Sequence, residues 1–203
     1  AALHLAQRGY RVTVLEAERV GWGASGRSGA QALFGVAAGQ DKLIRLLGAA
    51  DARRIWDMSV ESLALMRELI AAHAIDCDFV PGQMHVAIKP RQWNELQHWH
   101  DELHRDYGYT SVSLTSAAQT RALVDSARYI GGLHDSNSAH LQPLKYLRGL
   151  AAAAERAGCT IHVLTPVGRP SEQPGSYADQ SGSQRIAPAK GTTASWRPWH
   201  WRG

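Results

Sequence analysis

The sequence predicts an α/β fold, in which part of a layered domain with a parallel sheet is interrupted by an inserted α+β region. Two observations support this prediction. A small-residue helix, a glycine and an apolar strand follow one another in residues 1–16, and the same order returns in residues 143–164. Between these segments lies an excursion of strands and helices, after which the chain returns to the layered domain.

The first segment fits the second half of a βαβ unit. In AALHLAQRG, Ala2, Leu3 and Ala6 share a helical face, and Gly9 stands where a helix C-cap is expected. RVTVLE then reads as a buried parallel strand that ends in an acid, Glu16. We therefore expect the first strand and its glycine turn to lie upstream of Ala1, so that the fold is truncated.

The middle of the chain predicts several helices and strands. One helix carries an apolar stripe, expected to face the core, of Ile55, Met58, Ser59, Ser62, Leu65, Met66, Leu69 and Ile70. The expected helices are 41–47, 49–74, 90–107 (beginning at Pro90 and closed by Gly108) and 116–124 (capped by Ser116). Strands are expected on both sides of a Pro81-Gly82 turn within 75–88, at 112–114 and at 129–134.

These patterns suggest four parts. Residues 1–75 and 139–167 belong to the layered domain, and residues 76–138 to the inserted α+β domain. From Gly168 onward the chain is rich in Gly, Ser, Pro and Arg. Ile186 is the one aliphatic residue larger than Ala in this segment. Such a composition predicts a disordered tail over 168–203, because it offers too little apolar surface to offset the entropy of ordering. A frameshifted tail is the other prediction, because slipping the back-translated codons of SWRPWHWR by one base gives an apolar run.

Composition excludes several classes of protein. The formal net charge is +4, but residues 1–167 are nearly neutral and most of the excess lies in the tail, so no basic face suits nucleic acid. No apolar run reaches membrane-spanning length. The two cysteines, Cys77 and Cys159, are far apart, which favours reduced, buried thiols in a cytoplasmic protein.

A glycine-rich loop follows Glu16 and supplies the candidate site. An acid at the end of the second strand of a Rossmann-like unit can accept hydrogen bonds from ribose hydroxyls and disfavours a 2′-phosphate. The loop contains Gly21, Gly23, Gly26 and Gly29, which permit close backbone approach, and Ser25, Arg27 and Ser28, which offer hydrogen-bond donors to a phosphate or a flavin edge. A solvated acid beside an ordinary surface loop is the alternative.

The run LHLAQRGYRVTVLEAERVGWGASGRSGAQ resembles the start of the FAD-dependent oxidoreductases of the D-amino-acid-oxidase-like (DAO) superfamily, especially the gamma-glutamylputrescine oxidase subgroup. DCDFVPGQMHVA and HLQPLKYLRGLAAAAERAG extend the resemblance to about residue 167. It implies a partial FAD-binding domain of the glutathione-reductase type with an inserted substrate domain. It also implies oxidation of a C–N bond in a small amine or amino acid. The cofactor-binding residues that it implies are Glu16, Ser25, Gly26, Arg27, Ser28, Gly29 and Gln31.

The sequence departs from the family at three places. Ser28 and Ala30 replace the usual Asn and Gly, the upstream GxGxxG turn is absent, and the second half of the family fold is missing or replaced by the tail. Because the phosphate turn carries much of the affinity for a dinucleotide, we expect the chain to bind FAD poorly and to be inactive.

Other candidate residues favour structural roles. His100 and His104, with His98 nearby, have helical metal-ligand spacing, but no third ligand accompanies them and a solvated face is favoured. His140 is expected to cap or pack the helix that begins at Pro143. Trp93 and Trp99 are expected to cover the neighbouring sheet. No catalytic residue can be assigned, since in flavin chemistry the protein mainly positions the cofactor.

Two alternatives to an FAD-dependent oxidoreductase remain from the residues alone. An NAD-dependent dehydrogenase also places an acid after its second strand, although it needs no glycine- and serine-rich loop directly behind that acid. A non-catalytic pseudogene product or interaction protein with a basic tail is the other.

Overall fold

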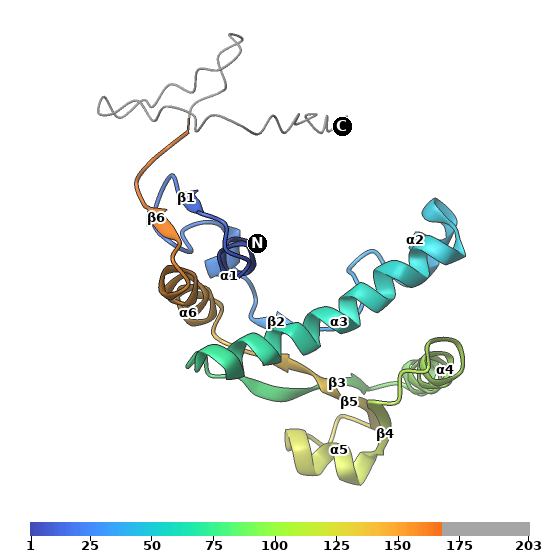
Figure 1. Ribbon diagram of the computed structural model, residues 1–203. Coiled ribbons are helices and arrows are strands. Elements are labelled where there is room, and N and C mark those ends of the chain that lie inside the picture. The colour runs from blue at the N-terminus through green and yellow to red at the C-terminus, as the bar shows by residue number, and fades with distance from the viewer. Residues whose placement is uncertain (168–203) are drawn as a thin grey trace.

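The computed structural model describes residues 1–167 and contains two separate sheets. The long helix α3 (Ala49–His73) lies along one of them and reaches α6 (Pro143–Arg156), beside the other, at its end (Figure 1). One sheet is parallel and has two strands, β1 (Thr13–Leu15) and β6 (Thr160–His162). The other is antiparallel and consists of β2 (Gln31–Ala32), β3 (Val80–Ala87), β4 (Val112–Ser116) and β5 (Gly131–His140). The expected tail, residues 168–203, lies outside the described residues.

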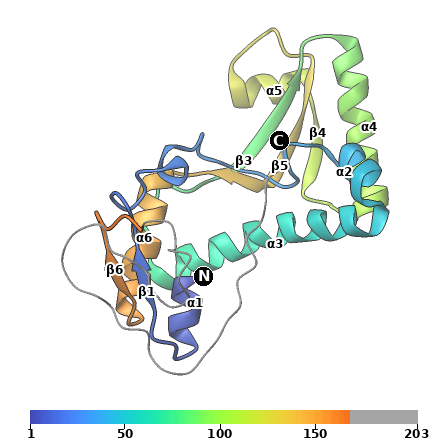
Figure 2. The same ribbon diagram turned by 90° about the horizontal axis from the view of Figure 1, so that it is seen from above.

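The parallel sheet unites the two ends of the described chain, as the repeated helix–glycine–strand pattern predicts. Helix α1 (Ala2–Gln7) leads into β1, and α6 (Pro143–Arg156) leads into β6. Gly9 and Gly158 have φ angles of +85° and +95°, the left-handed conformation expected after a helix. The two helices pack together through Leu3, Ala153 and Ala154. These units lie side by side at one end of the molecule (Figure 2).

The expectation that β1 is a buried strand is wrong. Val14 is half-buried and pairs with Ile161, but Leu15 on the opposite face is exposed. Within residues 1–167 the two-stranded sheet is covered by α1 and α6, which bury one face only. Strand patterns of apolar residues do not reveal whether a second layer is present.

In the antiparallel sheet, β5 is central. Strand β3 pairs along one edge of β5, whereas β4 and β2 share the other edge, β4 beside the first half of β5 and β2 beside its end. The turn expected at Pro81-Gly82 is instead a bulge inside one continuous strand, because both flanks of it pair with β5. Gly82 adopts a φ of +100° there. Residues 76–79 form no strand, and β5 continues to His140, beyond the expected 129–134.

The helices occur where they are expected. They are α2 (Gln40–Leu47), α3 (Ala49–His73), α4 (Pro90–Tyr107) and α5 (Ala117–Val124). Pro90 begins α4, and Gly108 ends it with a φ of 62°. Ser116 caps α5 by accepting a hydrogen bond from the Gln119 backbone N–H, at 3.3 Å.

The apolar stripe expected on α3 is partly wrong. Ala52, Trp56 and Leu63 are the buried residues of this helix, while Met58 and Leu65 are exposed. The antiparallel sheet and α4 set this face, because Trp56 packs with Leu103, Tyr109, Val112 and Leu133 in the main core. A helix with apolar residues around much of its circumference leaves the choice of buried face to its tertiary partners.

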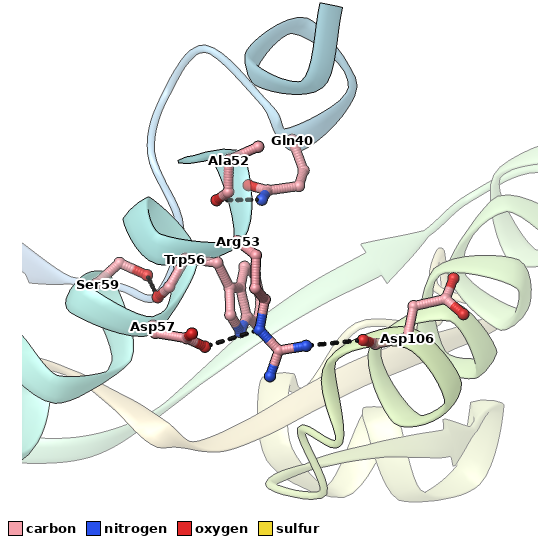
Figure 3. A network of polar contacts seen from close by, with 7 residues as sticks. All are labelled: Gln40, Ala52, Arg53, Trp56, Asp57, Ser59 and Asp106. Atoms are coloured by element: carbon pink, nitrogen blue, oxygen red, sulfur yellow. Dashed lines mark hydrogen bonds and ion pairs between the residues drawn. The ribbon is translucent and has the colours of Figure 1, made fainter. Parts of the chain in front are cut away.

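Polar contacts join α3 to its neighbours around Trp56 (Figure 3). The Gln40 side chain donates to the Ala52 carbonyl at 2.7 Å, which ties the start of α2 to α3. Arg53 donates to Asp57 on its own helix at 2.8 Å and to the Asp106 carbonyl near the end of α4 at 3.0 Å. No helix in the described part of the chain is both long and apolar enough to cross a bilayer.

Candidate cofactor-binding site

Glu16 lies directly after β1, at the carboxyl end of a parallel strand. Its backbone N–H donates to the His162 carbonyl at 2.8 Å and its carbonyl accepts from the Thr165 N–H at 2.9 Å, so it continues the pairing of β1 beyond the strand. Its side-chain Oε1 accepts from the Glu18 backbone N–H at 3.0 Å. This contact orients the half-buried carboxylate without consuming all its acceptor capacity.

A cavity of about 310 Å³ opens beside Glu16. Its walls come from the first turn of α1, Val14 and Ile161 on the sheet, and Leu147, Leu150 and Ala154 on α6. Gly21, from the loop behind β1, completes the lining. The cavity is therefore mainly apolar with one carboxylate at its border, a composition typical of a small-molecule site.

The glycine-rich loop folds back on itself around a short 3-10 helix, η1 (Ala24–Arg27). Gly21 and Gly26 approach so closely that a Cβ on Gly26 would overlap the Gly21 carbonyl. In contrast, a Cβ on Gly23 or Gly29 would meet nothing within 4 Å. The first pair of glycines therefore shapes the loop, and the second pair leaves open space beside the backbone.

A second cavity, of about 270 Å³, lies between this loop and α6. Ser25, Ser28 and Gln31 line it on the loop side, opposite Tyr146 and Leu147 of α6. Leu147 borders both cavities. Of the residues predicted to bind the cofactor, Glu16 therefore lines one cavity, three loop residues line the other, and Gly26, Arg27 and Gly29 line neither.

Ala30 shows the physical meaning of one departure from the family pattern. Its φ is 70°, in the left-handed region that favours glycine. The structure therefore explains why a glycine is usual at this position, since alanine carries a steric penalty there.

The candidate histidines lie on α4 and at the end of β5. His140 is exposed at the end of β5, and the expectation that it caps or packs α6 is wrong, since the Gln142 side chain caps that helix by accepting from the Lys145 N–H at 2.7 Å. The rings of His100 and His104 lie 4.2 Å apart. Among residues 1–167, no three His, Cys, Asp or Glu side chains cluster as a metal site.

The buried cysteines and the tryptophans of α4 lie where they are expected. Cys77 and Cys159 are buried and free, and burial raises the pKa of the Cys77 thiol. Trp93 lies against Gly131 of β5, and Trp99 packs edge-on against His85 of β3 with 4.9 Å between ring centroids. Both tryptophans therefore cover the antiparallel sheet, as predicted.

The sequence gives no sign of a buried polar network around Asp135 of β5. The Asp135 carboxylate is 1% exposed and accepts from the Tyr109 hydroxyl at 2.9 Å and from the backbone N–H groups of Asn137 and Ser138, both at 3.0 Å. Arg67 of α3 donates to the Asn137 side chain at 2.8 Å. A charged residue in a strand is the one local signal, and it does not identify these partners.

Comparison with known proteins places this geometry in a family. Residues 1–192 match the family described as DAO, FAD dependent oxidoreductase, so the match extends past residue 167, where the resemblance was expected to stop. The chain is 41% identical over 167 residues to a probable oxidoreductase, OrdL, of Haemophilus influenzae. It is 36% identical over 167 residues to the gamma-glutamylputrescine oxidoreductase of Escherichia coli. Each alignment covers 82% of this chain and 39% of the relative.

Solved structures share the fold at low identity. An L-amino acid deaminase from Proteus myxofaciens matches with a TM-score of 0.67 and 16% identity, over 87% of this chain and 38% of that one. Glycine oxidase from Bacillus cereus matches with a TM-score of 0.61 and 19% identity, over 87% of this chain and 46% of that one. With the family match over nearly its whole length, the chain belongs to the DAO family of FAD-dependent oxidoreductases.

Proposed function

We propose that the protein to which this chain corresponds oxidises a C–N bond of a small amine or amino acid, as a gamma-glutamylputrescine oxidase-like flavoprotein of the cytoplasm. The name of the Escherichia coli relative supports the amine, and the glycine oxidase and L-amino acid deaminase neighbours support a C–N bond. Because the chain spans about 39% of the curated relatives' length, this activity belongs to the whole protein.

The observation that carries the proposal is the position of Glu16, at the carboxyl end of a parallel strand and at the border of an apolar cavity. The residues present fit the adenosine half of FAD. A carboxylate there can accept hydrogen bonds from ribose hydroxyls, and its charge disfavours a 2′-phosphate. The apolar walls of the cavity suit the adenine ring, because they exclude water from it.

The loop fits the rest of the cofactor by the chemistry of its donors. Ser25, Ser28 and Gln31 present hydroxyl and amide groups to the second cavity, and the open backbone at Gly29 allows close approach. Gly26 holds the turn, and Arg27 supplies a positive charge beside it. When bound, FAD supplies the acceptor for the hydride, so that the chain's own residues bind, orient and exclude water.

We assign residues 1–75 and 139–167 to the FAD-binding domain and 76–138 to the substrate domain. The two sheets support this division, although β2 (Gln31–Ala32) pairs with β5 and so links the loop of the first domain to the antiparallel sheet. We further propose that residues 1–203 by themselves bind FAD weakly and do not turn over amines, because no GxGxxG phosphate-binding turn precedes α1 in these residues.

Calorimetric titration with FAD, together with the flavin content of the purified chain, tests this proposal. We expect less than stoichiometric flavin after purification and weak but measurable binding. Glu16→Gln weakens binding about tenfold, since hydrogen bonds to a charged group contribute about 1.5–3 kcal/mol. Glu18→Gln, which changes a neighbouring exposed carboxylate, is the matched control and leaves binding unchanged. Stoichiometric flavin would contradict weak binding, and equal affinities of the two variants would contradict the ribose role of Glu16.

A further inference from the structure

The loop behind Glu16 contains two contacts with the same spacing. Gly21 approaches Gly26 through the backbone, and Trp22 meets Arg27 through the side chains. The Arg27 Cζ lies 3.8 Å from the centroid of the Trp22 ring, within the range of a cation–π interaction. The Trp22 backbone N–H donates to the Arg19 carbonyl at 2.8 Å, which fixes the turn that presents the indole.

The Arg27 guanidinium lies on an aromatic ring and not beside a carboxylate. Arg53, Arg54 and Arg91 each pair with a carboxylate of their own helix at 2.8 or 2.9 Å. Within residues 1–167, Arg27 forms no ion pair and its guanidinium donates no hydrogen bond. Stacking on an aromatic face occupies the plane of a guanidinium and leaves its N–H groups, which point outward in that plane, available to an anion.

Along the loop, Trp22 and Arg27 stand between residues that line the two cavities. Gly21, next to Trp22, lines the cavity of Glu16, while Ser25 and Ser28, on either side of Arg27, line the second cavity. A dinucleotide has its diphosphate between its two halves. A ligand with its ribose at Glu16 and its other half in the second cavity therefore carries its negative charge past Arg27.

We propose that Trp22 is a positioning residue that holds Arg27 for the diphosphate of the dinucleotide; this inference rests on the proposed function. The indole restricts a long, flexible side chain to one orientation before the ligand arrives, so less conformational entropy is lost on binding. The indole is itself 42% exposed, so its removal leaves no cavity in the core.

Calorimetric titrations of the full chain with FAD, ADP and adenosine test this inference, because adenosine lacks the diphosphate. Trp22→Leu is expected to weaken binding of FAD and ADP about three- to fivefold, the equivalent of an exposed cation–π interaction, without changing that of adenosine. Trp22→Phe, which keeps an aromatic face, restores most of the affinity. Tyr10→Leu, at an aromatic residue 64% exposed in the same part of the fold, is the matched control.

Arg27→Gln separates the positioning role from a direct one. It is expected to weaken ADP binding about tenfold, and in this background Trp22→Leu causes no further loss. The inference is overturned if Trp22→Leu binds ADP like the unchanged chain, if it weakens adenosine equally, or if its effect persists without Arg27. If the unchanged chain binds neither FAD nor ADP, the weak binding proposed for these residues fails and this inference fails with it, whereas the activity proposed for the whole protein is tested separately by the flavin content and amine turnover of that protein.

Discussion

Replacing Asp135 by alanine tests why a carboxylate is buried in the middle of a strand. The edge of β5 opposite β3 pairs with β4 as far as Asp135 and with β2 from Ala139 onward. Residues 136–138 of β5 have no paired residue in β2, β4 or β3, so the gap affects both edges of the strand. The Asp135 carboxylate fills it by accepting the N–H groups of Asn137 and Ser138, and the Tyr109 hydroxyl donates to the same group.

The expected loss of stability follows from the donors that alanine leaves unpaired. The Tyr109 hydroxyl and the Ser138 N–H are buried, and each unsatisfied buried donor costs about 1–3 kcal/mol. Removing a buried charge also removes its desolvation penalty, which offsets part of this loss. We expect Asp135→Ala to lower the free energy of unfolding by about 3 kcal/mol. Asp135→Asn lowers it by about half as much, because the amide oxygen still accepts from a backbone N–H.

Urea denaturation followed by circular dichroism measures this change. Asp101→Ala is the control, because this carboxylate is exposed on α4 and its contact with His100 is a surface one, so a change within about 0.5 kcal/mol is expected. If Asp135→Ala unfolds at the same urea concentration as the Asp101→Ala control, the carboxylate does not hold the strand edge together and the reasoning is refuted.

Two further predictions concern the loop and the core. Gly26→Ala places a Cβ against the Gly21 carbonyl and is expected to lower the free energy of unfolding by about 1–3 kcal/mol, measured by thermal unfolding. Gly23→Ala, with open space around it, is the neutral control. Equal melting temperatures of the two variants would contradict the close packing of the loop. Desolvation raises the pKa of Tyr109, so the folded chain keeps this proton longer than the unfolded chain does. The resulting stability is complete below the unfolded pKa of about 10 and is lost as pH rises above it, so Tyr109→Phe makes the fall of the unfolding free energy above pH 10 shallower. An unchanged slope would show that Tyr109 does not titrate differently in the two states.

Local signals in the sequence determined most helix boundaries. The glycines after α1, α4 and α6, the proline that begins α4 and the Ser116 cap act through residues within one turn, so the sequence alone carries the information. The order of helix, glycine, strand and acid likewise identified the parallel unit and the position of Glu16. Both features depend on residues that are neighbours in the sequence.

Tertiary structure decided the features that depend on distant partners. Pro81-Gly82 became a bulge because β5 pairs on both sides of it, and α3 buries Trp56 rather than Met58 because the sheet and α4 lie on that side. Asp135 is buried because Tyr109 and the N–H groups at the gap in the strand edge compensate its charge. The same holds within the loop, where the sequence indicates glycines and an arginine, but the fold determines which glycines touch and what holds Arg27. Each outcome depends on the free energy of packing and hydrogen bonding between surfaces that the chain brings together only when it folds.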